Sequence, residues 1–263
     1  MIELTILGAC AACPAAGRAS SSYLVRSGTT SLVLDCGPGS LPNLRRQIDF
    51  AAVSAIVLSH LHADHILDLV PYHDGLRYGP AADPNRRVPL WTPPGGAARL
   101  AVLGSALGHD ATYFEQTFAI AEYDPAACLT LGDLRLRFAP TQHYIPCWAI
   151  RCEAGGAVLV YSADTGPAAA VAELARGADL FLCEATLLEP RAGEEQPGHL
   201  TAAEAGALAR QAGVRRLLIT HIWPELGPET LLADAAAAFG GPAALAREGD
   251  RHLVQPAQRQ PGG

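Results

Sequence analysis

The segment that most constrains this chain is Ser59–His65, which reads SHLHADH and directly follows a short apolar run. Three histidines and an aspartate fall within six positions there. Neutral imidazole and carboxylate are usual zinc ligands, so the pattern predicts a metal site at the end of a strand. His60 and His62 are two residues apart, so in an extended loop they point the same way and can share one ion. Asp64 and His65 are expected to turn into the next helix, where they can face a second ion.

One loop cannot complete two metal sites, so further ligands must come from elsewhere in the chain. The remaining candidates share one feature, because each follows an apolar run that is typical of a strand. They are His143 after Leu134–Ala139, Asp164 after Ala157–Tyr161 and His221 after Arg216–Thr220. Layered α/β proteins gather their sites past the C-terminal ends of strands. A surface cluster of histidines is the alternative, but solvent would not require these residue types at strand ends. His73, His109 and His252 lack this placement and are expected to be surface or structural residues.

Apolar runs and helical patterns alternate along the chain. The predicted strands are Leu4–Leu7, Ser21–Val25, Ser31–Asp35, Ala55–Ser59, Leu134–Ala139, Trp148–Cys152, Ala157–Tyr161, Leu180–Cys183 and Arg216–Thr220. Turn residues after Arg26 and after Glu153 predict two antiparallel hairpins. Strands that alternate with helices imply sheet layers covered by helices, which is an α/β fold.

The predicted helices are clearest in the second half of the chain. Thr201 and Glu204 have the spacing of a capping box, which would open a helix that runs to about Ala212. Further helices are predicted at Ala97–Leu107, from Pro167 to near Arg176, and at Thr230–Phe239. No linker of biased composition divides the chain, so residues 1–254 are predicted to form one domain and residues 255–263 a loose C-terminal tail.

Composition and charge make several classes of function unfavourable. The formal net charge is −7, and a surface that grips long nucleic acid usually needs a basic patch, so long RNA or DNA is an unfavoured partner. No apolar stretch approaches the roughly 20 residues that cross a bilayer, so no membrane association is expected. The first residues lack a basic leader, and seven cysteines favour a reducing cytoplasm over a disulfide framework. Cys10 and Cys13 form a lone CxxC, which supplies half a zinc site at most, and we favour unligated thiols.

These motifs together resemble the metallo-β-lactamase superfamily of hydrolases and, within it, the branch that contains ribonuclease Z and related phosphodiesterases. The resemblance runs from Met1 to about Val254. It rests on the His60–His65 motif, Ile6–Gly8 (ILG), Leu34–Gly37 (LDCG), Ser162–Thr165 (SADT), Cys183–Thr186 (CEAT), Gly198–Thr201 (GHLT) and the pair Thr220–His221. The superfamily implies a four-layer αββα sandwich with metal ions at one edge.

The resemblance also implies a ligand set for two divalent metal ions. By position, His60, His62 and His143 would bind the first metal, Asp64, His65 and His221 the second, and Asp164 would bridge the two. Zinc is the expected metal, although manganese and iron also suit imidazole and carboxylate. Family members often carry glycine where this chain has Ala163, which tightens the turn without removing a ligand.

Glu184 and His199 favour the ribonuclease Z branch of the superfamily, because their segments resemble the paired motifs that ribonuclease Z relatives use beside their metals. A carboxylate bonded to one imidazole nitrogen fixes the tautomer and raises the basicity of the other nitrogen. Such a histidine can donate a proton to a leaving alkoxide. The alternative is that Glu184 is a satisfied strand-end carboxylate and His199 merely precedes a helix cap.

The predicted function is hydrolysis of a small or cyclic phosphodiester, such as a cyclic nucleotide, by a metal-bridging hydroxide that Asp64 orients. His199, held by Glu184, would assist the leaving oxygen. Ribonuclease Z proper carries a basic arm that clamps tRNA, and no such arm stands between Leu90 and Thr130, which favours a small-molecule substrate. The alternatives are an ester, thioester or lactone hydrolase, tRNA 3′ processing of the ribonuclease Z type, and a di-iron redox or metal-binding protein. The sequence leaves the assembly open, and a homodimer is one alternative.

Overall fold

The computed structural model describes residues 1–80, 82–191, 193 and 197–256. The strands are β1 (Ile2–Gly8), β2 (Ser22–Ser27), β3 (Thr30–Leu34), β4 (Ala55–Val57), β5 (Val88–Thr92), β6 (Phe118–Glu122), β7 (Leu129–Leu131), β8 (Leu134–Pro140), β9 (Trp148–Ala154), β10 (Ala157–Tyr161), β11 (Leu180–Glu184), β12 (Leu217–Thr220), β13 (Ala243–Leu245) and β14 (Arg251–Val254). The helices are α1 (Ser40–Gln47), α2 (Ala63–Ile66), α3 (Leu69–Tyr78), α4 (Gly96–Ala106), α5 (Ala169–Ala175), α6 (Ala202–Ala212) and α7 (Pro228–Phe239), with short 3₁₀ turns at Phe50–Ala52 and Phe114–Gln116. Among the described residues, none of these helices is long and apolar enough to cross a membrane.

Two seven-stranded sheets with the same plan form the centre of the molecule. Their strand orders are β14-β1-β2-β3-β4-β5-β6 and β13-β12-β11-β10-β9-β8-β7. In each sheet an antiparallel part (β14-β1-β2-β3 and β7-β8-β9-β10) continues into a parallel part (β3-β4-β5-β6 and β10-β11-β12-β13). Because parallel strands need crossover connections, the helices fall on the outer faces of the two sheets.

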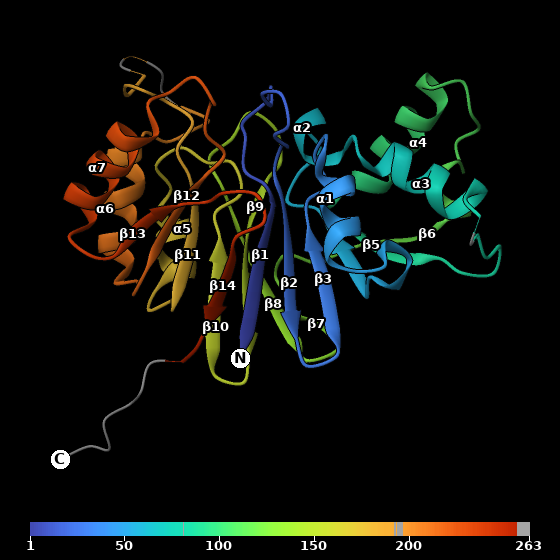
Figure 1. Ribbon diagram of the computed structural model, residues 1–263, viewed down its shortest axis with the longest axis horizontal. Helices are drawn as coiled ribbons and strands as arrows, with labels where there is room; N and C mark the ends of the chain where they lie inside the picture. Colours follow the sequence, from blue (N-terminus) through green and yellow to red (C-terminus); the bar gives the residue numbers. More distant parts are fainter. Residues whose placement is uncertain (81, 192, 194–196, 257–263) are drawn as a thin grey trace.

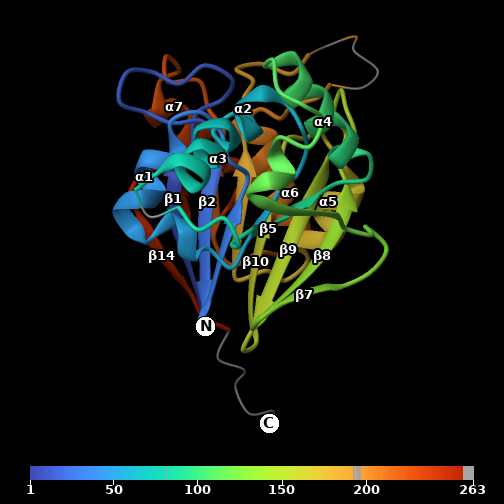
Figure 2. The same ribbon diagram turned by 90° about the vertical axis from the view of Figure 1, so that its right-hand side faces the viewer.

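Alternating burial along the strands builds the layers. Leu32 and Leu34 of β3 face the other sheet, whereas Val33 between them packs under the helices of its own side. On β11 Leu182 faces inward and Phe181 packs under the helices of the second side. The period of two puts an apolar side chain on each face, so both sheets are buried on both sides. The result is an αββα sandwich, with α1 to α4 on one side and α5 to α7 on the other (Figures 1 and 2).

The structure confirms the predicted α/β class and the four-layer sandwich. Both predicted hairpins are present, β2–β3 and β9–β10. The capping box is also present, since Thr201 Oγ1 accepts from the Glu204 backbone N–H while the Glu204 carboxylate accepts from Thr201 N–H. β14 ends at Val254, and residues 257–263 of the predicted tail lie outside the described residues.

Several elements were not predicted. They are the strands β5, β6, β7, β13 and β14 and the helices α1 and α3, whereas the helix expected at Asp64 and His65 is present as α2. β7 and β13 are three residues long, too short for a periodic pattern to appear. β5 contains Pro89, which argues against a strand when the sequence is considered alone. β5 nevertheless pairs in parallel with β4 on one side and with β6 on the other.

Candidate metal centre

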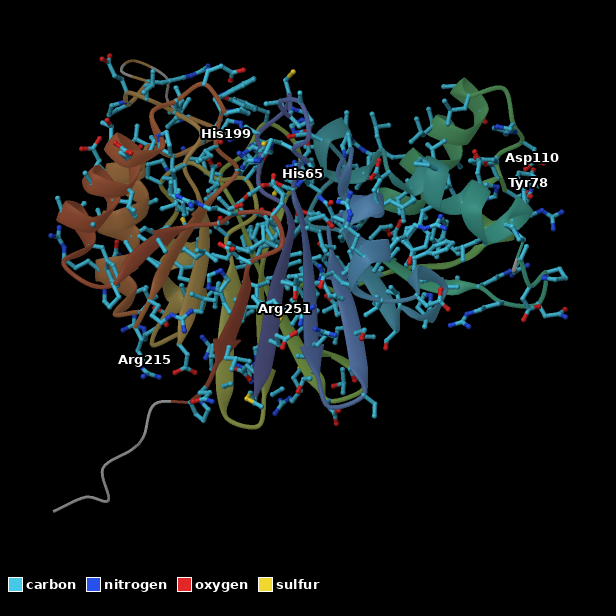
Figure 3. All side chains as sticks on the ribbon, viewed as in Figure 1. His65, Tyr78, Asp110, His199, Arg215 and Arg251 are labelled. Atoms are coloured by element: carbon cyan, nitrogen blue, oxygen red, sulfur yellow. The ribbon has the colours of Figure 1, made fainter. Side chains whose placement is uncertain are left out.

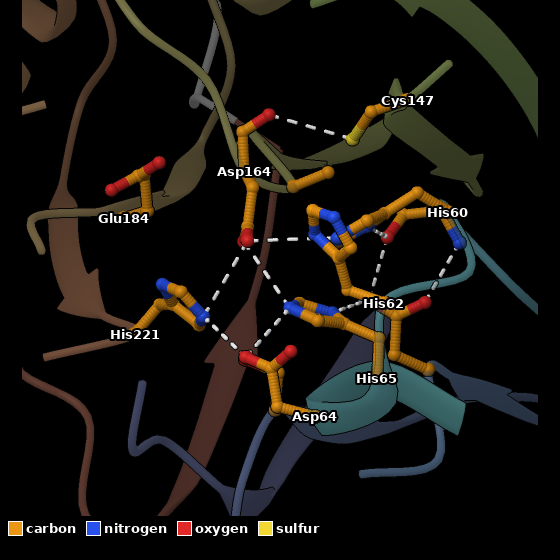
Figure 4. Close-up of polar contacts among 12 residues, drawn as sticks. His60, His62, Asp64, His65, Cys147, Asp164, Glu184 and His221 are labelled. Atoms are coloured by element: carbon orange, nitrogen blue, oxygen red, sulfur yellow. Dashed lines mark hydrogen bonds and ion pairs between the residues drawn. The ribbon is translucent and has the colours of Figure 1, made fainter. Parts of the chain in front are cut away.

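The seven predicted ligands lie together past the strand ends at one edge of the sandwich, where Figure 3 labels His65, and Figure 4 labels all of them except His143 in close-up. They are His60, His62, Asp64, His65, His143, Asp164 and His221. Four come from the loop after β4 and the start of α2. The others come from the loops after β8, β10 and β12, so four connections meet at this edge.

The first group of side chains is His60, His62, His143 and Asp164, whose potential ligand atoms lie within 4.8 Å of one another. His143 Nε2 lies 2.9 Å from His62 Nδ1. Asp164 Oδ2 lies 3.6 Å from His60 Nε2 and 3.8 Å from His143 Nε2. Three imidazoles and one carboxylate converge here, a donor set that suits zinc.

The second group is Asp64, His65, Asp164 and His221. Asp64 Oδ2 lies 3.1 Å from His221 Nε2 and 3.5 Å from His65 Nε2. Asp164 Oδ1 lies 3.3 Å from His65 Nε2, and its Oδ2 lies 3.5 Å from His221 Nε2. Asp164 is the one member common to both groups.

Three buried atoms in these groups have no hydrogen-bond partner among the described residues: His60 Nε2, His65 Nε2 and Asp164 Oδ1. Leaving a buried polar atom unpaired costs roughly 1–3 kcal/mol, so such atoms call for a ligand. Zinc bonds to nitrogen and oxygen of roughly 2 Å imply ligand atoms roughly 3.3 Å apart around a tetrahedral ion. The separations of 2.9–3.8 Å between these atoms in the two groups bracket this value. The residues therefore fit divalent metal ions.

The outer nitrogens of the histidines are fixed by neighbours. His143 Nδ1 donates to the Gly198 carbonyl at 2.8 Å. His221 Nδ1 lies 2.7 Å from Thr186 Oγ1, whose own hydrogen goes to the Glu184 carboxylate at 2.8 Å, so the imidazole donates. An N–H directed outward leaves the inner nitrogen with a free lone pair, which is the form that binds metal.

Asp35 supports the inner histidines, and sequence reasoning assigned it no role. Its Oδ2 accepts from His65 Nδ1 at 2.8 Å, from Tyr161 Oη at 2.9 Å and from Ser59 Oγ at 2.7 Å. Ser59 Oγ in turn lies 2.9 Å from His60 Nδ1 and accepts from it, because its hydrogen is given to Asp35. One fully buried carboxylate thus orients a histidine in each group.

Glu184 and His199 stand beside the second group. His199 Nδ1 donates to Glu184 Oε1 at 2.9 Å. Glu184 also accepts from the backbone of Thr165 and Thr186 and from the Thr186 hydroxyl. Its carboxylate is fully buried, and its lone pairs are used by these donors, so it acts as an acceptor and not as a metal ligand. The His199 ring stacks on His221 with centroids 5.6 Å apart.

The pKa values of His199 and Asp64 are shifted in opposite directions. Burial by itself would lower the pKa of His199, but the hydrogen bond and the charge of Glu184 outweigh it and raise the pKa above the ordinary value. Burial would raise the pKa of Asp64, yet the hydrogen bond from His221 and the nearby histidines lower it to about 2. His199 is therefore biased toward the form that can donate a proton, and Asp64 toward the ionised form.

Backbone strain is concentrated at this site. Three non-glycine residues of the described chain have positive φ, namely Asp35 at 56°, Ala163 at 52° and His221 at 51°. The left-handed region costs an L-residue on the order of 1 kcal/mol or more. All three belong to or directly precede site residues. Glycine would adopt the conformation of Ala163 without this cost, because it has no Cβ.

The residues set aside as structural lie outside the two groups. His73 is buried with Nδ1 2.8 Å from Thr117 Oγ1, and the exposed His109 stacks on Tyr113. Cys10 is buried, which raises its thiol pKa, and Cys13 is exposed.

The comparison with known families agrees with the fold and the site. The family model described as a beta-lactamase superfamily domain matches residues 30–222. This chain belongs to the metallo-β-lactamase superfamily, and it is a metallo-hydrolase of that superfamily. A metal-binding edge with divalent ions is the common property that the fold implies.

Two curated relatives are similar over nearly their whole length. The probable metallo-hydrolase YhfI of Bacillus subtilis is 31% identical over 94% of this chain and 98% of its own. A ribonuclease Z of Mycobacterium bovis is 32% identical over 97% of this chain and 99% of its own.

Solved structures share the fold. The crystal structure of YhfI has a TM-score of 0.85 with 27% identity and covers 95% of this chain and 98% of its own. Human tRNase Z, short form, has a TM-score of 0.74 with 18% identity over 96% of this chain and 99% of its own. A diphosphatase from the PhnP family has a TM-score of 0.72 with 21% identity over 97% of this chain and 99% of its own.

Proposed function

We propose that this chain is a binuclear metal-dependent phosphodiesterase whose substrate is a small or cyclic phosphodiester, such as a cyclic nucleotide. In this proposal His60, His62 and His143 hold the first ion, Asp64, His65 and His221 hold the second, and Asp164 bridges them. Zinc is the proposed metal. The observation that carries the proposal is the pair formed by His199 and Glu184 at 2.9 Å, directly beside both groups of ligands.

Two divalent ions bound there supply Lewis-acid activation of water and of the phosphoryl group. The protein supplies the acid. His199 Nδ1 is committed to Glu184, so Nε2 is the atom from which a proton reaches the leaving oxygen. Asp64 stays ionised and can accept a hydrogen bond from the attacking water, which orients it.

A proton donor at His199 favours phosphodiesters over carboxylic esters and lactones as substrates. An alkoxide is a poor leaving group, and its departure from phosphorus gains most from a proton donor with a raised pKa. The buried, fully bonded Glu184 keeps His199 in this role. An ester hydrolase would need the metals for the oxyanion but would have less use for the His199 proton.

The charge distribution favours a small substrate over tRNA. Arg18, the basic residue retained in the early loop, is paired with Glu248 at 2.7 Å. Arg215 and Arg251 lie well below His199 in the view of Figure 3. Each phosphate contact of a long polyanion needs a nearby cation. The ribonuclease Z relatives nevertheless make tRNA 3′ processing the second candidate.

A substrate panel tests the proposal on protein loaded with zinc or manganese. The panel contains bis(p-nitrophenyl) phosphate, a 3′,5′-cyclic nucleotide, a p-nitrophenyl ester, a lactone, a thioester and a precursor tRNA at moderate salt. We expect hydrolysis of the first two and little cleavage of tRNA. Efficient lactone or thioester hydrolysis without phosphodiesterase activity would overturn the reaction class. Efficient tRNA trimming would overturn the small substrate and leave the metal site intact.

A further inference from the structure

Tyr144 is a large aromatic residue at the open side of the metal centre. It follows the ligand His143, and 54% of its surface is exposed. Its ring centroid lies 5.2 Å from that of His143 and 5.8 Å from that of His199. The ring therefore borders both a proposed ligand and the proposed proton donor, while more than half of it faces solvent.

The Tyr144 ring rests against Gly198, the residue before His199. A Cβ atom at Gly198 would lie 2.5 Å from the ring atoms Cε2 and Cζ, far closer than any real contact. Only glycine leaves room for the ring at this place. The ring is thus seated on the backbone that carries His199.

The loop that carries Tyr144 is held at several points. Thr141 N–H donates to the Cys147 carbonyl at 3.0 Å, which closes the loop. The Gln142 carbonyl accepts from Gly166 N–H at 2.7 Å, and the Gln142 side chain donates to the Pro197 carbonyl at 3.1 Å. The loop that carries the ring is thus anchored, so its backbone loses little freedom when a ligand packs on the ring, which favours binding.

We propose that Tyr144 is a specificity-determining residue of this site. Its exposed ring stacks on a flat ring in the part of the substrate that the leaving oxygen carries. The inference rests on the proposed function, because His199 marks where the leaving oxygen lies and Tyr144 is its aromatic neighbour. The substrate class is then phosphodiesters that carry a nucleobase or an aryl group, in preference to purely aliphatic ones. Every base has a π-face, so the platform would select for a ring without selecting one base.

The test separates ring recognition from recognition of the phosphate. AMP and ribose 5-phosphate share the sugar and the phosphate and differ in the base. Their binding to metal-loaded protein is measured by calorimetry for the wild type, Tyr144→Leu and Tyr144→Phe. The control is Tyr78→Leu, since Tyr78 is 69% exposed and lies at the far end of the molecule from His199 (Figure 3).

We expect the wild type to bind AMP more tightly than ribose 5-phosphate. Tyr144→Leu should weaken AMP binding by roughly tenfold, within the range for stacking of one base, and change ribose 5-phosphate binding less than about twofold. Tyr144→Phe should bind AMP with the affinity of the wild type, and Tyr78→Leu should change the affinity for neither AMP nor ribose 5-phosphate. Equal affinity of the wild type for both ligands, no measurable AMP binding, or an equal loss of both ligands in Tyr144→Leu would overturn the proposal. These readouts do not use turnover, so an absence of phosphodiesterase activity in the wild type would refute the proposed function separately.

Discussion

The two sides of the metal centre differ in burial and in what holds them. We define the floor of the site as the buried candidate ligands His60, His65 and Asp164, and the rim as Tyr144 and His199, which lie beside the candidate ligands. The floor is fully buried and presents ligand atoms that have no partner among the described residues. The rim is partly open to solvent. If the floor binds the ions and the rim contacts the substrate, as we propose, changes at the floor should lower metal content and changes at the rim should lower substrate binding or turnover.

The largest effect is expected from Asp164→Ala. Asp164 belongs to both groups of ligands, so its loss should lower occupancy at both positions and abolish activity. Elemental analysis should give about two transition-metal ions per wild-type chain, as a paired site requires, and clearly fewer in the variant. Asp133→Ala, in the exposed turn between β7 and β8, is the control and should keep both ions. Full double occupancy in Asp164→Ala would refute the bridging role.

A large effect on turnover without metal loss is expected from His199→Ala and Glu184→Gln. The first removes the proposed proton donor and the second removes the negative charge that lies 2.9 Å from it. Each should reduce kcat by roughly a hundredfold, the usual scale for general acid–base groups. Metal content is measured on the same samples. If His199→Ala loses metal, His199 is a ligand and the division into floor and rim fails at this residue.

A smaller effect is expected from Thr186→Val, which keeps the shape of the side chain and removes the hydroxyl. The hydroxyl accepts from His221 Nδ1 and donates to Glu184, so it fixes the ligand form of His221. Loss of such an outer contact commonly weakens metal binding by about 10–100-fold, and we expect the lower end. Competition with a chelator measures the affinity. Thr186→Ser should restore it, and unchanged affinity in Thr186→Val would show that the hydroxyl does not control His221.

The candidate metal ligands could be proposed from the sequence, because each follows an apolar run or belongs to the His60–His65 motif. The groups that support them could not. Asp35 reaches Ser59 only because β3 and β4 pair in parallel, with Leu34 opposite Val57. Nothing in the spacing of 24 residues indicates this contact. The one local sign was that Asp35 follows an apolar run, as the predicted ligands do.

The same limit explains why Thr186 and Tyr144 had no predicted role. Thr186 meets His221 because β11 and β12 run side by side, with Glu184 opposite Thr220. Tyr144 meets His199 through Gly198, 54 residues farther along the chain. Sequence patterns show which face of a strand is apolar, but neighbours across a sheet or a loop depend on strand order, which short strands such as β13 do not reveal.

The smallest expected effect is a shift in the pH dependence of kcat. It tests whether Glu184 sets the pKa of His199, the proposed proton donor. His199 donates only when protonated, so kcat should be constant below its pKa and fall as pH rises through it. Burial lowers this pKa, but Glu184 raises it by more, so the fall should come at a higher pH than for an ordinary histidine. In Glu184→Gln the negative charge is gone, and the remaining activity should fall at a lower pH than in the wild type. Both proteins are compared with the same metal loaded, so any effect of the ions on the pKa is common to both and the difference isolates Glu184. The measurement is kcat against pH for a cyclic nucleotide, with metal content checked at each end of the range. If kcat falls at the same pH in both proteins, a group other than His199 donates the proton. The rim would then have a role in substrate binding but not in proton transfer.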